Sequence, residues 1–162
     1  MQPLILFYSH SGNTRRVAQA MANQIGGNCY EILPQTPYPT DYQTVVEQAK
    51  EEIKAGFLPD LQPLACDLQA VDTLFIGTPN WWSTMAPPVA AFLRRYDVDS
   101  KKIFPFCTHG GGGSARIGRD IKRACPHSEV AEPFAIYGNG GTSLEQEINH
   151  WLKTQAFTKN KE

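Results

Sequence analysis

The apolar positions of this chain follow two alternating patterns. Short apolar runs, typical of buried strands, lie at about 3–8, 28–33, 71–77, 102–108 and 129–137. Between these runs, apolar residues recur every three or four positions, as on one face of a helix. Five strands that alternate with five helices predict an α/β fold, a three-layer doubly wound sandwich built on a five-stranded parallel sheet.

Local signals give the expected ends of the helices. Gly26 follows a predicted helix at 13–25 and should end it, and Asp41 is the candidate cap of a helix at about 41–55. Thr142 and Ser143 each have Glu or Gln three residues later, which predicts a capping box for the last helix.

Length and composition indicate one ordinary domain. The 162 residues suit a single domain at 1–157, with a polar, frayed tail at 158–162. The net charge of −1 and the lack of a basic stripe argue against a nucleic-acid partner. No apolar run approaches the ~20 residues of a membrane span, and the N-terminus does not resemble a signal peptide, so we expect a cytoplasmic protein without membrane insertion.

The four cysteines do not form a metal or redox motif. They are far apart in the sequence and lack C-x-x-C spacing, so free thiols and no metal site are expected. Cys107 lies inside an apolar run and should be in the core, whereas Cys125 precedes a proline and is expected to be the most exposed.

The first strand ends in a loop suited to an anion. Ser9, Ser11 and Thr14 supply hydroxyls, and Gly12 opens the backbone just before a helix whose first N–H groups need acceptors. Arginines at 15 and 16 sit where the helix dipole disfavours cations, a conflict that bound phosphate would remove. The alternatives are an ordinary N-cap turn and two solvated arginines.

The loops after the third and fourth strands carry aromatic residues and glycine. Adjacent Trp81 and Trp82 cannot easily share one core position, so at least one should be partly exposed and able to stack on a planar ring. Four glycines at 110–113 follow His109 and would let the backbone approach a ligand edge. Outer-core packing of the tryptophans and a flexible glycine connection are the alternatives. Ligands of doubly wound sheets bind where such loops converge.

Three motifs resemble those of the flavodoxin family. They are Ser9-His10-Ser11-Gly12-Asn13-Thr14, the segment Gly77-Thr78-Pro79-Asn80-Trp81-Trp82, and Cys107-Thr108-His109-Gly110-Gly111. The resemblance covers nearly the whole domain and implies strand order 2-1-3-4-5, a flavodoxin-like fold, with bound flavin mononucleotide (FMN). It assigns the phosphate to the first motif and the flavin ring to Pro79, Asn80, Trp81, Trp82, Thr108, His109, Gly110, Gly111 and Gly112.

The chain also departs from the family pattern. Well-known flavodoxins are strongly acidic, and many place a tyrosine from the last of these loops on the flavin ring. This chain is nearly neutral and has no tyrosine in 108–116, which leaves one face of the ring open. A near-neutral surrounding repels reduced, anionic flavin less, so we expect a reduction potential less negative than in acidic flavodoxins.

The resemblance leaves three functions in view. The first is an electron carrier between redox partner proteins, without catalytic side chains of its own. The second is an FMN-dependent reductase that passes electrons from a nicotinamide nucleotide to a quinone-like acceptor. The third is a non-redox binding domain of the same fold. The oligomeric state stays open.

Overall fold

A central parallel sheet organises the chain. The computed structural model describes residues 2–158. The main strands, in spatial order, are β2 (Asn28–Glu31), β1 (Leu4–Phe7), β3 (Thr73–Trp81), β5 (Lys102–His109) and, both paired with β5, β6 (Glu129–Val130) and β7 (Phe134–Tyr137). Since β6 and β7 occupy the place of the fifth predicted strand, the expected order 2-1-3-4-5 is confirmed.

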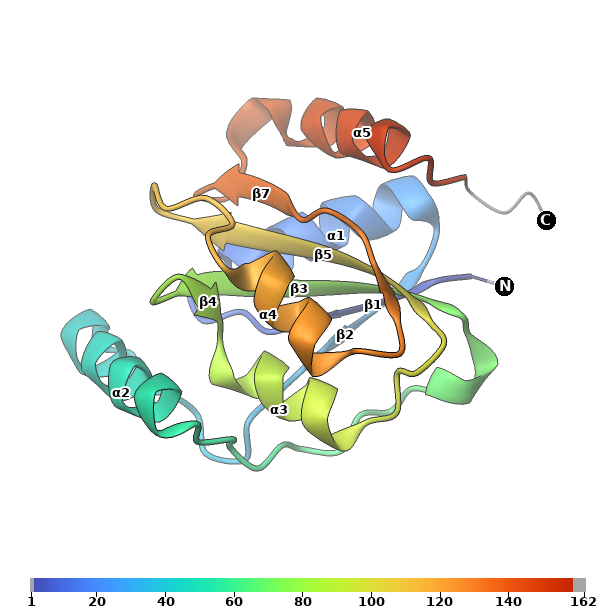
Figure 1. The fold of residues 1–162 in the computed structure, drawn as a ribbon. Coiled ribbons are helices and arrows are strands. Elements are labelled where there is room, and N and C mark those ends of the chain that lie inside the picture. The colour runs from blue at the N-terminus through green and yellow to red at the C-terminus, as the bar shows by residue number, and fades with distance from the viewer. Residues whose placement is uncertain (1, 159–162) are drawn as a thin grey trace.

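Helices cover both faces of the sheet, as predicted (Figure 1). One face carries α1 (Asn13–Ile25) and α5 (Leu144–Thr154). The other carries α3 (Pro87–Arg95) and α4 (Ile117–Ala124), with α2 (Tyr42–Ala55) standing at the side of the molecule (Figure 1). Short 3-10 turns, η1 (Leu68–Ala70) and η2 (Gly141–Ser143), precede β3 and α5.

Three strand predictions differ from the structure, and the second strand ends at Glu31 rather than at 33. The fifth predicted strand breaks at 131–133, because Pro133 has no N–H for the ladder and the N–H of Glu132 donates to Gln155 Oε1 at 3.3 Å. The third runs on to Trp81 rather than ending at Gly77, and its end pairs antiparallel with β4 (Thr84–Met85). The result is a hairpin at the carboxyl edge of the sheet.

The cap predictions had different outcomes. Asp41 is confirmed as the N-cap of α2, since its carboxylate accepts from the N–H of Thr44 at 2.9 Å. The Thr44 hydroxyl donates to the same carboxylate at 2.6 Å, and this bond, followed by the one from the Thr44 N–H, holds the pKa of Asp41 below its usual value. The predicted capping box of α5 is wrong: Ser143 lies at the N-cap but its hydroxyl donates to Glu147 at 3.2 Å rather than accepting a backbone N–H.

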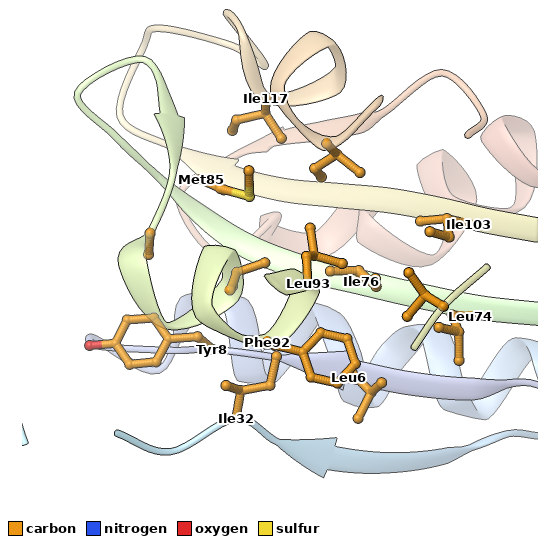
Figure 2. Packing of buried hydrophobic residues seen from close by; sticks show 14 of the residues in the cluster. Leu6, Tyr8, Ile32, Leu74, Ile76, Met85, Phe92, Leu93, Ile103 and Ile117 are labelled. Carbon is orange, nitrogen blue, oxygen red and sulfur yellow. The ribbon is translucent and has the colours of Figure 1, made fainter. Parts of the chain in front are cut away.

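The core consists of two clusters, one on each face of the sheet. The cluster beneath α3 and α4 is mainly aliphatic (Figure 2), whereas the cluster beneath α1 and α5 holds Phe75 and Phe104, stacked with ring centroids 4.8 Å apart. Cys107 is fully buried, as predicted. The expected exposure of Cys125 was wrong, since it is only 2% exposed and burial raises its pKa to about 11.

The remaining chain-level findings are brief. Within residues 2–158, no helix is both long enough and apolar enough to cross a membrane. Of the tail predicted to be frayed, residues 159–162 lie outside the described part of the chain.

Candidate functional site

A cleft of about 540 Å³ opens at the carboxyl ends of the parallel strands. Its lining comes from the loop after β1, from the carboxyl ends of β3, β5 and β7 with the residues that follow them, and from one side of α2. Ten of the fifteen predicted site residues line it: His10, Ser11, Asn13, Pro79, Asn80, Trp81, Trp82, Thr108, His109 and Gly110. The other five, Ser9, Gly12, Thr14, Gly111 and Gly112, lie outside its lining.

The Ser9 side chain forms hydrogen bonds within the first loop and does not face the cleft. The Ser9 hydroxyl accepts from the N–H of Gly12 at 3.1 Å and of Arg15 at 3.2 Å, which fixes the turn into α1. Gly12 has φ +96°, a conformation that favours glycine. In the described chain, the N–H groups of Asn13 and Thr14 have no acceptor, so the start of α1 presents two donors beside the cleft.

A buried hydrogen bond joins the first and third loops. The hydroxyls of Thr14 and Thr108 lie 2.8 Å apart, and the two residues are 1% and 4% exposed. The bond links positions 94 residues apart in the sequence. Thr14 therefore holds the loops together with its side chain.

The two arginines of α1 bind protein groups instead of facing the cleft. Arg15 forms an ion pair with Glu31 of β2, with Nη2 and Oε1 2.5 Å apart. Arg16 donates to the carbonyls of Asn139 and Gly141 in the loop after β7. These contacts resolve the conflict with the helix dipole without an anion, so that part of the phosphate argument loses its force.

The β3–β4 hairpin presents both tryptophans in different ways. Trp81 is partly buried and meets the rings of Tyr8, His10 and Tyr38 edge-on, with centroids 5.5, 5.9 and 5.1 Å away. Trp82 is 45% exposed and its Nε1–H donates to the Val46 carbonyl of α2 at 2.9 Å. The expected partial exposure of at least one indole is confirmed.

The hairpin turn has an unusual backbone. Trp82 and Ser83 occupy the two central positions with φ +54° and +70°, where Asn and Gly are the usual residues. Asn80 braces this turn, because its Oδ1 accepts from the N–H of Ser83 at 2.9 Å and its Nδ2 donates to the Gly113 carbonyl at 2.8 Å. Asn80 thus ties the hairpin to the glycine loop.

Two buried tyrosines, Tyr8 and Tyr38, pack against Trp81. The Tyr38 hydroxyl donates to Glu52 of α2 at 2.5 Å. Burial, followed by this hydrogen bond, raises the pKa of Tyr38, and burial raises that of Tyr8, whose hydroxyl points out from the end of the core cluster (Figure 2). Both hydroxyls therefore keep their protons in the folded protein at neutral pH.

The glycine loop is held by side chains on both sides. His109 Nδ1 accepts from the N–H of Gly111 at 3.0 Å, which assigns the proton of a neutral ring to Nε2. Gly111 has φ +135° and needs glycine. The Gly113 carbonyl accepts from Asn80 at the other end of the loop. The loop is tied at both ends, contrary to the flexible alternative.

Sequence reasoning missed six residues that line the cleft. Four lie on α2, one ends β7 and one follows that strand: Tyr42, Val45, Val46, Ala49, Tyr137 and Gly138. Tyr42 and Tyr137 are 73% and 69% exposed. An aromatic residue and glycine at the carboxyl end of the fifth strand were a signal available in the sequence, whereas the position of α2 was not.

The lining of the cleft includes no carboxylate, lysine or arginine. Apart from two histidines, no ionisable acid or base other than tyrosine lines it. Apolar walls, hydroxyls and free helical N–H groups together fit a planar ring that carries a phosphate monoester. Within residues 2–158, no three His, Cys, Asp or Glu side chains gather so that they could hold a metal ion.

Comparisons with known proteins place the chain in a family. The family model for flavodoxin matches residues 2–155. A comparison with curated proteins found no match.

Similar solved structures include a proposed flavoprotein from Bacteroides eggerthii DSM 20697, with 24% identity, a TM-score of 0.86 and 97% and 99% of the two chains covered. A flavoprotein from Lactobacillus acidophilus NCFM in complex with FMN shares 22% identity, with a TM-score of 0.71 over 93% and 97%. Oxidised Flavodoxin 2 from Bacillus cereus shares 14%, with a TM-score of 0.60 over 96% and 98%. These likenesses show a flavodoxin-like fold.

Proposed function

Since this chain belongs to the flavodoxin family, we propose that it binds FMN and acts as an electron-transfer protein. The observation that carries the proposal is the convergence of three loops on one neutral, ring-sized cleft beside the start of α1. A similar structure from Lactobacillus acidophilus contains FMN, which supports the same cofactor here.

The residues of the cleft divide the binding of FMN between them. The free N–H groups of Asn13 and Thr14 and the Ser11 hydroxyl hold the phosphate, with the partial positive charge of the helix behind them. The Trp81–Trp82 hairpin packs on the ring. The His109 Nε2–H and the main chain at Gly110 face its polar edge.

The cofactor supplies the electron chemistry, and the protein sets its surroundings. Because no carboxylate lines the cleft, a negatively charged, reduced ring meets little repulsion there. We therefore propose a reduction potential less negative than in acidic flavodoxins. The proposed partners are a reductase and an acceptor protein, and the proposed location is the cytoplasm, where the four free cysteines stay reduced.

A reductase is the second candidate. The apolar side of α2 gives the cleft a wall beyond the tryptophan hairpin, formed by Val45, Val46 and Ala49 with Tyr42 at its end. Such a surface suits a second planar molecule, a nicotinamide nucleotide or a quinone, next to the ring.

The test is uptake of FMN by the purified protein, followed by absorbance, and then anaerobic addition of a nicotinamide nucleotide. A carrier keeps its flavin oxidised until a reductase is added, and an enzyme bleaches with the nucleotide alone. Failure to take up FMN contradicts both and leaves the non-redox binding domain.

A matched variant pair tests the phosphate site. Ser11→Ala should weaken FMN binding about 10-fold or more and leave riboflavin binding unchanged, because a hydrogen bond to a charged phosphate is worth ~1.5–3 kcal/mol. Ser143→Ala, outside the cleft, serves as the control. If Ser11→Ala weakened the binding of FMN and of riboflavin equally, Ser11 would not be a phosphate ligand.

A further inference from the structure

Tyr137 is an exposed aromatic side chain on the cleft wall. It is the last residue of β7, is 69% exposed, and lines the cleft together with Gly138. A large ring left open to water at a concave site loses the stabilisation that burial would bring. A ligand that fills the cleft would cover the exposed ring of Tyr137, which the hairpin tryptophans leave uncovered.

The backbone of Tyr137 is fixed while its ring is not enclosed. Tyr137 pairs in register with His109 of β5, and the N–H of the next residue, Gly138, donates to the His109 carbonyl at 2.9 Å. Its ring meets the His109 ring edge-on, with centroids 6.0 Å apart and planes at 76°. The main chain thus places the ring beside a residue that faces the cleft.

The loop after Tyr137 is anchored to the helix of the first loop. Arg16 of α1 donates to the carbonyls of Asn139 and Gly141, the second at 3.1 Å. The Asn139 side chain in turn accepts from the N–H of Gly141 at 3.0 Å. These bonds hold the end of β7 in a fixed relation to the start of α1.

Trp81 and Tyr137 come from the two strands that flank β5. β5 lies between β3, which carries Trp81, and β7, which carries Tyr137. Neighbouring strands are ~4.8 Å apart, so the two outer backbones are separated by about 10 Å. A planar ring in contact on both faces needs about 7–8 Å between its neighbours.

We propose that Tyr137 packs on the planar ring of the cleft ligand from the β7 side, opposite the β3–β4 hairpin, and shields that face from solvent. The proposal rests on the proposed FMN function and contradicts the expectation of one open face, which considered only residues 108–116. It adds a contact from a strand that the sequence motifs do not include.

The experiment measures dissociation constants for FMN and for riboflavin, by absorbance titration, in the wild type, Tyr137→Phe and Tyr137→Leu. A stacked aromatic pair is worth ~0.5–1.5 kcal/mol, so Tyr137→Leu should weaken the binding of both ligands by the same factor, about two- to twelve-fold. Tyr137→Phe should bind like the wild type. Solvent-perturbation absorbance of the bound flavin should show a more exposed ring only in Tyr137→Leu.

The control is Phe57→Leu, which removes an exposed aromatic residue (53% exposed) outside the cleft lining. If Tyr137→Leu and Phe57→Leu have the same dissociation constants for FMN and for riboflavin, the inference is overturned and the proposed function stands. Loss of FMN binding without loss of riboflavin binding also overturns it, since it indicates an effect on the phosphate. A wild type that takes up neither flavin overturns the proposed function, and the ring contact with it. Tyr137→Gln, which also lacks the ring but keeps a polar side chain, replaces Tyr137→Leu if that variant melts at a lower temperature than the wild type.

Discussion

Helices α1 and α2 both border the cleft, but they do so in opposite ways. α1 buries a full stripe against the sheet, including Val17, Met21 and Ile25, none more than 1% exposed. α2 has 14 residues, one more than α1, yet buries only Val45 and Ala49. Figure 1 shows α2 set apart from the other helices, beyond β4. The N-terminus of α1 borders the cleft while the rest of that helix covers the core, whereas α2 borders the cleft along one side.

The largest expected effect is on the free energy of unfolding, when one buried residue of each helix is truncated to alanine. Met21→Ala is expected to lower the free energy of unfolding by about 3 kcal/mol, because it opens a cavity in a closed core. Val45→Ala should cost only about 1.5 kcal/mol, since it removes two methyl groups next to an open cleft. Urea unfolding measures both, and equal losses would show that α2 seals the core as α1 does.

Alkaline pH should lower the stability of the protein through Tyr38, which is hydrogen-bonded to α2. Tyr38 keeps its proton when folded, because burial and the bond to Glu52 raise its pKa, whereas the unfolded chain releases that proton near pH 10. Unfolding is therefore favoured as the pH rises above 10, by about 1 kcal/mol between pH 10 and pH 11. Tyr8 adds a decline of the same sign.

Tyr38→Phe should remove the part of the alkaline destabilisation that comes from Tyr38. The free energy of unfolding of the variant should therefore fall less than that of the wild type between pH 10 and pH 11. Tyr42→Phe, whose hydroxyl is in solvent in both states, is the matched control. Parallel pH profiles for the wild type and Tyr38→Phe would contradict the assignment.

The smallest effect concerns how α2 is fastened. Trp82→Phe removes the Nε1–H that donates to the Val46 carbonyl, a partly exposed bond worth ~0.5–1 kcal/mol. Amide hydrogen exchange in the middle of α2 should become about three- to five-fold faster, while exchange in α1 stays the same. Equal acceleration in both helices would mean that the hairpin stabilises the whole domain rather than α2.

The sequence predicted the features that depend on local pattern. The bounds 13–25 of α1, the Asp41 cap and the strand order follow from periodicity, capping chemistry and a family resemblance, and all agree with the structure. Ten of the site residues line the cleft because their loops follow adjacent parallel strands. The binding roles given to them stay predictions.

Features that depend on contacts between distant segments could not be read from the sequence. The Trp82–Ser83 turn has positive φ at both positions but lacks the Asn-Gly signal of such turns. Arg15 and Arg16 seemed to need an anion until Glu31 and the loop after β7 came into contact with them. Cys125 precedes a proline, a turn signal, but the start of that turn is buried by tertiary packing.

The hydroxyl pair of Thr14 and Thr108 also bears on the order in which the protein folds. It bridges 94 positions and exists only once β1 and β5 have joined the same sheet through β3. Such long-range closure is slow, so the loop cluster should be completed after the transition state for folding. A ligand that binds this cluster stabilises contacts absent from the transition state, and should therefore prolong the lifetime of the native state without hastening its formation.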